Sequence, residues 1–207
     1  GNDEYARDNN SFGLTTMRNR HVRVSRSTLR FRFKGKGGKS HDIAFDDVRL
    51  ARIVRRCQDL PGHELFGYVD DAGEVQDIGS TDVNEYLREV TGQDFTAKSF
   101  RTWAATVLAA CAFQDLPERQ SQAQTKRNVV KAVEAVAGLL GNTPTICRKS
   151  YIHPSIVDAY IDGTLPRTRR ARKLKAVSAP LSDFPRMETA VLGWLHRLQR
   201  VAQRRTA

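Results

Sequence analysis

The chain has 207 residues, and its 34 Lys and Arg outnumber 23 Asp and Glu to give a formal net charge of +11. A chain of this length buries a core without disulfides, and three cysteines with no CxxC pair suit a reducing compartment rather than a disulfide or zinc framework. No run approaches the ~20 apolar residues of a membrane-spanning helix, so we expect a cytoplasmic protein. The positive charge favours nucleic acid over a membrane surface as the partner, because the basic residues are spread along the whole chain.

The N-terminal part of the chain is predicted to contain a small sheet. Residues 1–13 show no helix or strand pattern of their own. Bulky and basic residues alternate over residues 22–33, which predicts a strand, and the glycines at 35–38 predict a turn before a second strand from Ser40. Residues 45–60 have the spacing of an amphipathic helix.

The rest of the chain is predicted to be mainly helical. Thr143 and Pro144 are typical of a helix N-cap and first turn, and a further short helix is expected after Pro154. The segment 167–175, RTRRARKLK, lacks periodicity and predicts a basic connector. Other helices are expected over residues 81–90, 97–113, 118–140 and 187–203, following a short strand at 66–69.

The predicted fold class is α+β, mainly α, organised as one domain with a small N-terminal sheet. Its expected parts are a β-rich N-terminal segment with a lysine-bearing hairpin (1–44), a helical core that holds the functional site (45–163), a basic connector (164–186) and a C-terminal helix (187–207).

The glycine-rich string GKGGKS, residues 35–40, is the first motif with functional meaning. It is not a phosphate-binding P-loop, because Phe33 stands where that motif requires a glycine. One interpretation is a hairpin whose Lys34, Lys36 and Lys39 reach the phosphates of a nucleic acid. The commoner alternative is a solvated lysine-rich turn.

Two further motifs carry candidate phosphate chemistry. In AKSFRTW, Lys98 and Arg101 fall in the first turn of a predicted helix, where positive charge opposes the helix dipole and a bound phosphate resolves the conflict. The alternative is a surface pair screened by water. In GNTPTICRKSYIHP, Tyr151 follows Arg148 and Lys149, two cations that favour phenolate character in a nucleophile, although a tyrosine is by default a core or surface aromatic.

Taken together and in this order, these segments resemble the type IB DNA topoisomerases, particularly the small poxvirus-like enzymes found in bacteria. The resemblance runs from EYARDNNSFGLTTMRNRHV through FRFKGKGGKSHDI and AKSFRTW to LGNTPTICRKSYIHPSIVDAY. It implies a helical catalytic domain of the tyrosine recombinase and topoisomerase IB type. It also implies an isomerase that acts as a monomer on double-stranded DNA at the nucleoid, without a cofactor or a small-molecule substrate.

The resemblance assigns roles to individual residues. It implies that Tyr151 attacks a DNA phosphodiester to form a 3′-phosphotyrosyl intermediate, and that Lys36 protonates the leaving 5′-oxygen. Arg101 holds the non-bridging oxygens, assisted by Lys98, and Asn142 stands where many members have histidine and donates a hydrogen bond. Relaxation then needs neither ATP nor a metal ion. Further DNA contacts are expected from Tyr5, Lys34, Lys39, His41, Lys98, Arg148 and Lys149.

The resemblance also has a gap at the front of the chain. The family pattern Arg-x-Gly-x-x-x-Tyr matches Gly1 and Tyr5, so its arginine falls two residues before Gly1. The N-terminal domain that closes over the duplex is likewise not part of this sequence. We therefore expect the 207-residue chain to bind DNA weakly and to cleave it poorly.

Two alternative functions remain open from the sequence. A tyrosine recombinase or integrase uses the same 3′-phosphotyrosyl chemistry, but its His-x-x-Arg pair is replaced here by Asn142-Thr143-Pro144-Thr145. The other alternative is a DNA-binding module without catalytic turnover.

Overall fold

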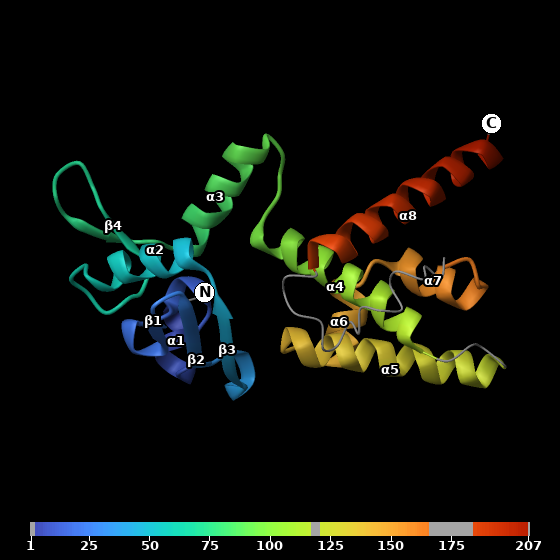
Figure 1. Cartoon of the computed structure of the whole chain (residues 1–207), viewed down its shortest axis with the longest axis horizontal. Coiled ribbons are helices and arrows are strands. Elements are labelled where there is room, and N and C mark those ends of the chain that lie inside the picture. Colours follow the sequence, from blue (N-terminus) through green and yellow to red (C-terminus); the bar gives the residue numbers. More distant parts are fainter. Residues whose placement is uncertain (1–2, 117–120, 166–183, 207) are drawn as a thin grey trace. The chain divides into compact units, whose positions relative to one another are not determined.

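The computed structural model describes residues 3–116, 121–165 and 184–206, without the side chains of Asp3, Tyr5 and residues 201–206. The chain divides into two compact units, Gly1–Ala97 and Lys98–Ala207 (Figure 1). The division falls inside the segment 45–163 that the sequence analysis treats as one helical core, because the first helix of that segment packs on the sheet of the first unit.

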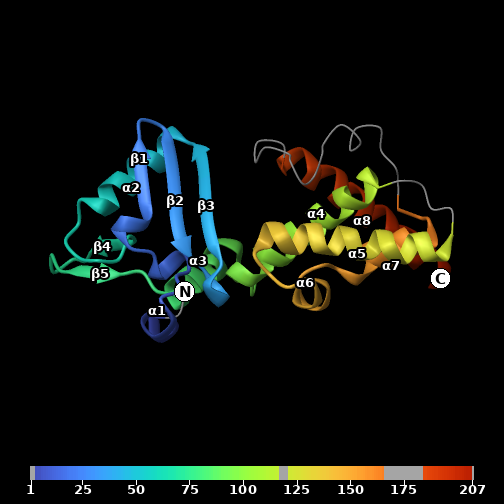
Figure 2. The ribbon, with the colours of Figure 1, turned by 90° about the horizontal axis from the view of Figure 1, so that it is seen from below.

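The first unit is built on a three-stranded antiparallel sheet in the order β1-β2-β3, seen in Figure 2. Its strands are β1 (Val22–Ser25), β2 (Thr28–Lys34) and β3 (Ser40–Asp46). The single strand predicted over residues 22–33 is therefore wrong, because a two-residue turn at 26–27 folds that segment back on itself. Arg26 takes a φ of 51°, a left-handed conformation that few residues other than glycine adopt.

Helix α2 (Val48–Gln58) covers the apolar face of this sheet. Asp47 caps the helix by accepting the Leu50 N–H at 2.8 Å. The buried residues of the helix are Ala51 and Val54, which pack with Leu29 of β2. Leu50 is 42% exposed, so the apolar stripe that helical spacing suggests is only partly buried.

The remaining elements of the first unit include one that the sequence analysis missed. Helix α1 (Asp3–Asn9) occupies the segment predicted to have no structure. Its Ala6 is buried and Asn10 ends it with a φ of 47°. Glu4 in the first turn and Arg7 in the last turn also suit the helix dipole. The others are the single turns η1 (Leu14–Thr16), η2 (Asn19–His21) and η3 (Lys36–Gly38), strands β4 (Gly67–Val69) and β5 (Val75–Asp77), and helix α3 (Ser80–Thr91).

Within its described residues, the second unit is built from helices joined by short turns. It contains α4 (Ala97–Asp115, whose first residue lies in the first unit), α5 (Gln122–Leu140), α6 (Pro144–Ser150), α7 (Pro154–Asp162) and α8 (Phe184–Thr206). Val107, Val136 and Ile156 are almost fully buried at its centre. The predicted mainly helical α+β composition is thus confirmed, whereas the predicted basic connector lies largely in 166–183, outside the described residues.

A buried polar contact and an aromatic stack hold α5, α7 and α4 together. Asn128 of α5 donates its side-chain N–H to the Tyr160 hydroxyl at 2.6 Å, and the Tyr160 ring stacks on Phe113 with centroids 4.3 Å apart. Within the described residues, no helix combines the length and apolarity needed to cross a membrane.

The ionisation of His21, in the first unit, makes the stability of the folded protein depend on pH. Burial, followed by the positive charges of Arg20 and Arg18, lowers the pKa of its imidazole below the ordinary value of 6.5. The unfolded chain therefore binds a proton more readily than the folded chain, and stability falls as the pH drops through 6.5 toward the folded pKa. Histidine ring NMR in a phosphate-free buffer is expected to show a lower His21 pKa in the native protein than in urea. Equal values in the two states contradict the assignment.

Candidate active site

Tyr151 lies at the end of a short helix whose start and finish are both fixed. The Thr143 hydroxyl accepts the Ile146 N–H at 3.3 Å, and Pro144 occupies the first turn, as predicted from the sequence. At the other end, the N–H groups of Tyr151 and Ile152 both donate to the Cys147 carbonyl at 3.0 Å. Because the Cys147 side chain is fully buried, these bonds fix the Tyr151 backbone to the core.

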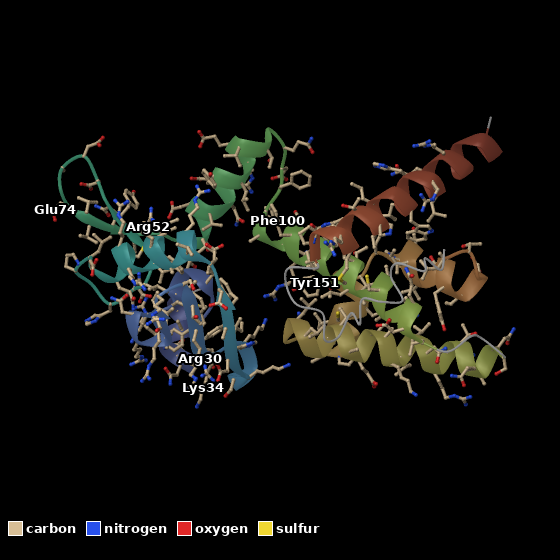
Figure 3. All side chains as sticks on the ribbon, in the orientation of Figure 1. Arg30, Lys34, Arg52, Glu74, Phe100 and Tyr151 are labelled. Carbon is tan, nitrogen blue, oxygen red and sulfur yellow. The ribbon has the colours of Figure 1, made fainter. Side chains whose placement is uncertain are left out.

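Arg101 and Tyr151 are brought together from separate helices of the second unit. The Arg101 guanidinium carbon lies 5.8 Å from the centroid of the Tyr151 ring, within the range of a cation–π contact. Arg101 is exposed on α4, and Tyr151 is half-buried (Figure 3 labels its side chain). The pair thus places an exposed cation beside a phenol ring, and both belong to the residues to which the resemblance assigns phosphodiester chemistry.

Thr106, which the sequence analysis did not single out, ties α4 to the turn that follows Tyr151. Its hydroxyl accepts the His153 N–H at 3.1 Å. The hydroxyl proton lies within reach of two carbonyls, Thr102 at 2.8 Å and Tyr151 at 3.4 Å. Since Thr106 is 3% exposed and lies on the same helix as Arg101, it fixes the distance between that arginine and the Tyr151 backbone.

Replacing Thr106 by valine is expected to loosen the Arg101–Tyr151 pair. The change leaves the His153 N–H without its acceptor inside the protein, which costs about 1–3 kcal/mol of unfolding free energy. Chemical denaturation followed by tryptophan fluorescence measures this loss, because Trp103 and Trp194 both lie in the second unit. Thr106→Ser keeps the hydroxyl and serves as the matched control. Equal stability of the valine and serine variants contradicts the assignment.

The other predicted residues of the second unit lie on α4, on α6 and in the turn between α5 and α6. Lys98 is exposed in the first turn of α4, and Arg148 and Lys149 are exposed in the last turn of α6. Asn142 lies between α5 and α6, where its side-chain N–H donates to the Leu140 carbonyl at a long 3.4 Å. A phosphate oxygen is a better acceptor for that amide, since the present bond is at the limit of hydrogen-bond geometry.

Trp103 makes a second contact between helices that sequence reasoning did not identify. Its indole N–H donates to the Glu188 carboxylate at 2.6 Å. This bond joins α4 to α8 at a position two residues after Arg101. Helical spacing predicts that Phe100 lies on the buried side of the same helix with Trp103 and Val107, but Phe100 is 54% exposed, so that part of the prediction is wrong (Figure 3). Trp103 and Val107 do pack against the core.

Lys36 lies at the tip of the β2–β3 hairpin, in the first unit. It is exposed in η3, where Gly37 and Gly38 both have a φ of 73° and so allow a turn that other residues rarely form. Lys34 and Lys39 flank the tip and are also exposed. The Gly35 N–H donates to the Lys39 carbonyl at 2.8 Å and closes the turn.

Gly35 and His41 hold this tip by close contact. The His41 ring stacks on Phe33 with centroids 4.9 Å apart and faces Gly35 so closely that a Cβ there would lie 2.7 Å from His41 Nε2. Gly35→Ala is therefore expected to displace the tip and to lower the rate of DNA cleavage by about 10²-fold, the scale of an ångström misplacement of a catalytic group.

Gly138→Ala is the matched control for that prediction, because no atom lies within 4 Å of the Cβ it adds. Single-turnover cleavage of a labelled duplex measures both variants. Equal rates for Gly35→Ala and Gly138→Ala contradict a positioning role for the close contact.

The first unit also carries the predicted DNA contact Tyr5. The backbone of Tyr5 lies in α1, but its side chain is outside the described residues. Among the described residues, no cluster of three or more His, Cys, Asp or Glu side chains is arranged to hold a metal ion.

Comparison with known proteins gives the class of this chain. Residues 1–176 match the family model of the eukaryotic DNA topoisomerase I catalytic core, which is more than half of the chain, so the chain belongs to that family. It is similar to the DNA topoisomerase 1B of Acanthamoeba polyphaga mimivirus, with 28% identity over 167 residues that make up 77% of this chain and 50% of the viral protein. It is also 21% identical over 164 residues to the DNA topoisomerase 1B of Vaccinia virus strain Copenhagen, covering 78% and 49% of the two chains.

These comparisons confirm the resemblance to the poxvirus-like type IB enzymes. The chain spans about half the length of the curated relatives it matches. The relatives reported are viral, so the bacterial origin suggested by the sequence stays a prediction.

Proposed function

We propose that the protein relaxes supercoiled DNA as a type IB topoisomerase, by cutting and rejoining one strand through a 3′-phosphotyrosyl intermediate. Family membership supports DNA as the partner. The observation that carries the proposal is the Arg101 guanidinium 5.8 Å from the centre of the Tyr151 ring, since a nucleophile and a phosphate-binding cation need to lie side by side.

The proposed reaction is a pair of transesterifications. The Tyr151 hydroxyl gives up its proton to solvent as its oxygen attacks the phosphorus, the bond to the 5′-oxygen breaks, and Lys36 gives a proton to that oxygen. Arg101 and Asn142 donate hydrogen bonds to the non-bridging oxygens and stabilise the charge that gathers there. The free 5′-hydroxyl later attacks the phosphotyrosine and restores the strand.

The proposed reaction requires neither ATP nor a metal ion. One phosphodiester is exchanged for another, so the bond energy is kept in the protein–DNA linkage and rejoining requires no ATP. Charge stabilisation comes from Arg101, Lys98 and Asn142, so the proposal assigns no step to a metal ion.

Basic residues of both units are proposed to hold the duplex. Lys34 and Lys39 flank the hairpin tip in the first unit, while Arg148 and Lys149 end α6 in the second. All four are exposed and meet phosphates without reading sequence. His41 and Tyr5 complete the proposed set of DNA contacts.

Several broader features belong to the same proposal. We infer that the helical unit has the catalytic fold shared by tyrosine recombinases and type IB topoisomerases. The predicted segments 1–44, 45–163, 164–186 and 187–207 are proposed as the functional parts of the whole chain. The protein is proposed to act as a monomer in the cytoplasm at the nucleoid, with no small-molecule substrate.

The test uses the natural full-length protein beside the 207-residue chain, on negatively supercoiled plasmid in EDTA without ATP. Relaxation by the full-length protein is expected, together with weak or no relaxation by the chain alone. Failure of the full-length protein on plasmid contradicts the proposal. Cleavage confined to one specific site then indicates a recombinase, and binding without cleavage indicates a DNA-binding module.

A further inference from the structure

Two N–H groups, the Arg18 backbone N–H and the Arg20 Nε–H, point at the two ring nitrogens of His21. A neutral imidazole has one N–H and one acceptor nitrogen. Its Nδ1 accepts the Arg18 backbone N–H at 3.0 Å, so the ring proton is on Nε2. Arg20 Nε lies 3.4 Å from that same Nε2, and a guanidinium nitrogen is always a donor. Protonation of the ring leaves Nε2 a donor as well, so in both states two N–H groups face each other.

The ring is held firmly in this position. His21 is 8% exposed, and its ring packs against Phe12 with centroids 4.4 Å apart. The guanidinium carbons of Arg18 and Arg20 lie 5.4 Å and 5.9 Å from the centroid of Phe12. The two facing donors are therefore fixed by packing around Phe12, and an acceptor that lies beside the pair, within reach of both nitrogens, satisfies both.

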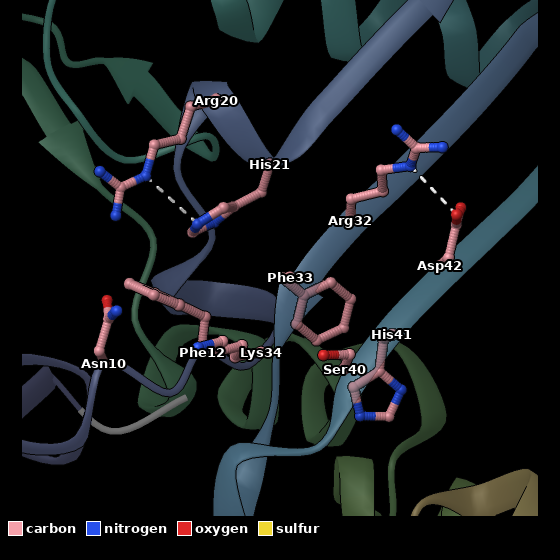
Figure 4. Close-up of a pocket in the computed structure, with 10 residues that line it drawn as sticks. All are labelled: Asn10, Phe12, Arg20, His21, Arg32, Phe33, Lys34, Ser40, His41 and Asp42. Atoms are coloured by element: carbon pink, nitrogen blue, oxygen red, sulfur yellow. Dashed lines mark hydrogen bonds and ion pairs between the residues drawn. The ribbon is translucent and has the colours of Figure 1, made fainter.

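These donors line a cavity of about 480 Å³ at an open edge of the sheet (Figure 4). Strand β1 pairs with β2 only as far as Phe31, so the end of β2 has no β1 partner. The Phe12 N–H donates to the Lys34 carbonyl at 2.7 Å and closes part of that edge. The cavity opens beside this contact, in the first unit alone.

The charge of the cavity wall selects the kind of ligand. Arg20, Arg32 and Lys34 line it, against one carboxylate, Asp42. Asp42 is already shared, because Arg30 binds it through two nitrogens at 2.7 and 2.8 Å and Arg32 binds it at 3.0 Å. The bidentate contact with Arg30 holds the pKa of Asp42 at about 2, so the carboxylate stays paired and the cavity keeps an excess of positive charge.

From the facing donors of Arg20 and His21 and the cationic wall around them, we propose that this cavity binds a phosphate of the DNA backbone. One non-bridging oxygen accepts from both His21 Nε2 and Arg20 Nε, and Lys34 lies on the same cavity wall. The sugar-phosphate chain then runs along the open edge of β2, at the base of the hairpin that carries Lys36. This proposal rests on the proposed function only in taking DNA as the source of the phosphate.

The test is a salt titration of duplex binding by the full-length protein, with Tyr151→Phe in all variants to prevent cleavage. Neutralising one phosphate contact lowers the slope of log affinity against log salt by about 0.9. Arg20→Gln is expected to show this reduction, and Arg20→Lys to keep most of the slope. Arg52→Gln, the same charge change on the exposed side of α2, is the matched control and is expected to leave the slope unchanged (Figure 3).

A second measurement identifies the source of the phosphate. The ¹⁵N resonance of His21 Nε2 is followed while either duplex DNA or sodium phosphate is added at constant ionic strength. A shift with duplex supports the proposal, whether or not free phosphate also shifts the signal. A shift with sodium phosphate alone, or with neither, overturns it, as does an Arg20→Gln slope equal to that of Arg52→Gln.

Plasmid relaxation by the protein with Tyr151 intact separates this proposal from the proposed function. If relaxation occurs but Arg20→Gln leaves the salt slope unchanged, the phosphate site is wrong and the topoisomerase function stands. If relaxation fails while the slope and the His21 signal change as expected, the phosphate site stands without that function.

Discussion

Tyr151→Phe is expected to abolish covalent attachment to DNA and plasmid relaxation by the full-length protein. The change removes one oxygen from a half-buried ring and leaves the backbone bonds to Cys147 unaltered. Loss of a nucleophile lowers the rate on the order of 10⁴-fold or more in other enzymes. Denaturing gel electrophoresis of a labelled duplex measures the covalent complex, and agarose electrophoresis measures relaxation.

The control for this variant is Tyr86→Phe. Tyr86 is 62% exposed on α3, so the same loss of a hydroxyl occurs outside the proposed site. It is expected to keep full activity. A covalent complex that persists in Tyr151→Phe means that another residue attacks the DNA, and the assignment of the nucleophile is then wrong.

Arg101→Ala is the second large effect that we expect. Without the guanidinium, the non-bridging oxygens lose a charged donor at the moment when negative charge gathers on them, which lowers the cleavage rate by about 10²–10³-fold. Arg101→Lys is expected to recover only part of the rate, because a lysine is a point charge without the planar pair of donors. Duplex affinity changes much less than the rate, since many other cations hold the backbone.

Single-turnover cleavage and duplex binding, measured side by side, distinguish this role from general attraction. Arg127→Ala on α5 removes the same charge from an exposed position whose guanidinium donates to Gln124 at 3.0 Å. It is expected to leave the cleavage rate unchanged. An Arg101→Ala variant that loses affinity and rate by the same factor contradicts a role in the transition state.

The helices were largely predictable because their signals are local. The Thr143–Pro144 pair predicts the start of α6, and the helical periodicity of apolar residues predicts α4 within a few residues of its bounds. The β1–β2 turn was not predictable in this way, since Arg26 takes a left-handed conformation without the glycine or asparagine that normally signals it. Helix α1 was missed because its seven residues are too few to show helical periodicity, although Asp3 and Glu4 in its sequence suit a helix start and burial of Ala6 supports the helix.

The residues of the candidate site likewise divide into those with a local sequence signal and those known only from tertiary contacts. Tyr151, Arg101 and Lys36 were proposed from motifs, and the structure adds the contact between the first two. Thr106 and Glu188 gave no signal in the sequence, because their bonds to His153 and Trp103 join segments far apart in the chain. A hydroxyl or carboxylate that satisfies such a bond is visible only once the packing is known.

The bonds around Cys147 and Thr106 have a mechanical consequence for the proposed covalent state. When the cut strand rotates, torque reaches the protein through the phosphotyrosine at Tyr151. The backbone on either side of that residue is tied to α6 through the Cys147 carbonyl and to α4 through the Thr106 hydroxyl. The load therefore passes into two packed helices, and the bond to be resealed stays at a fixed place on the protein while the DNA turns.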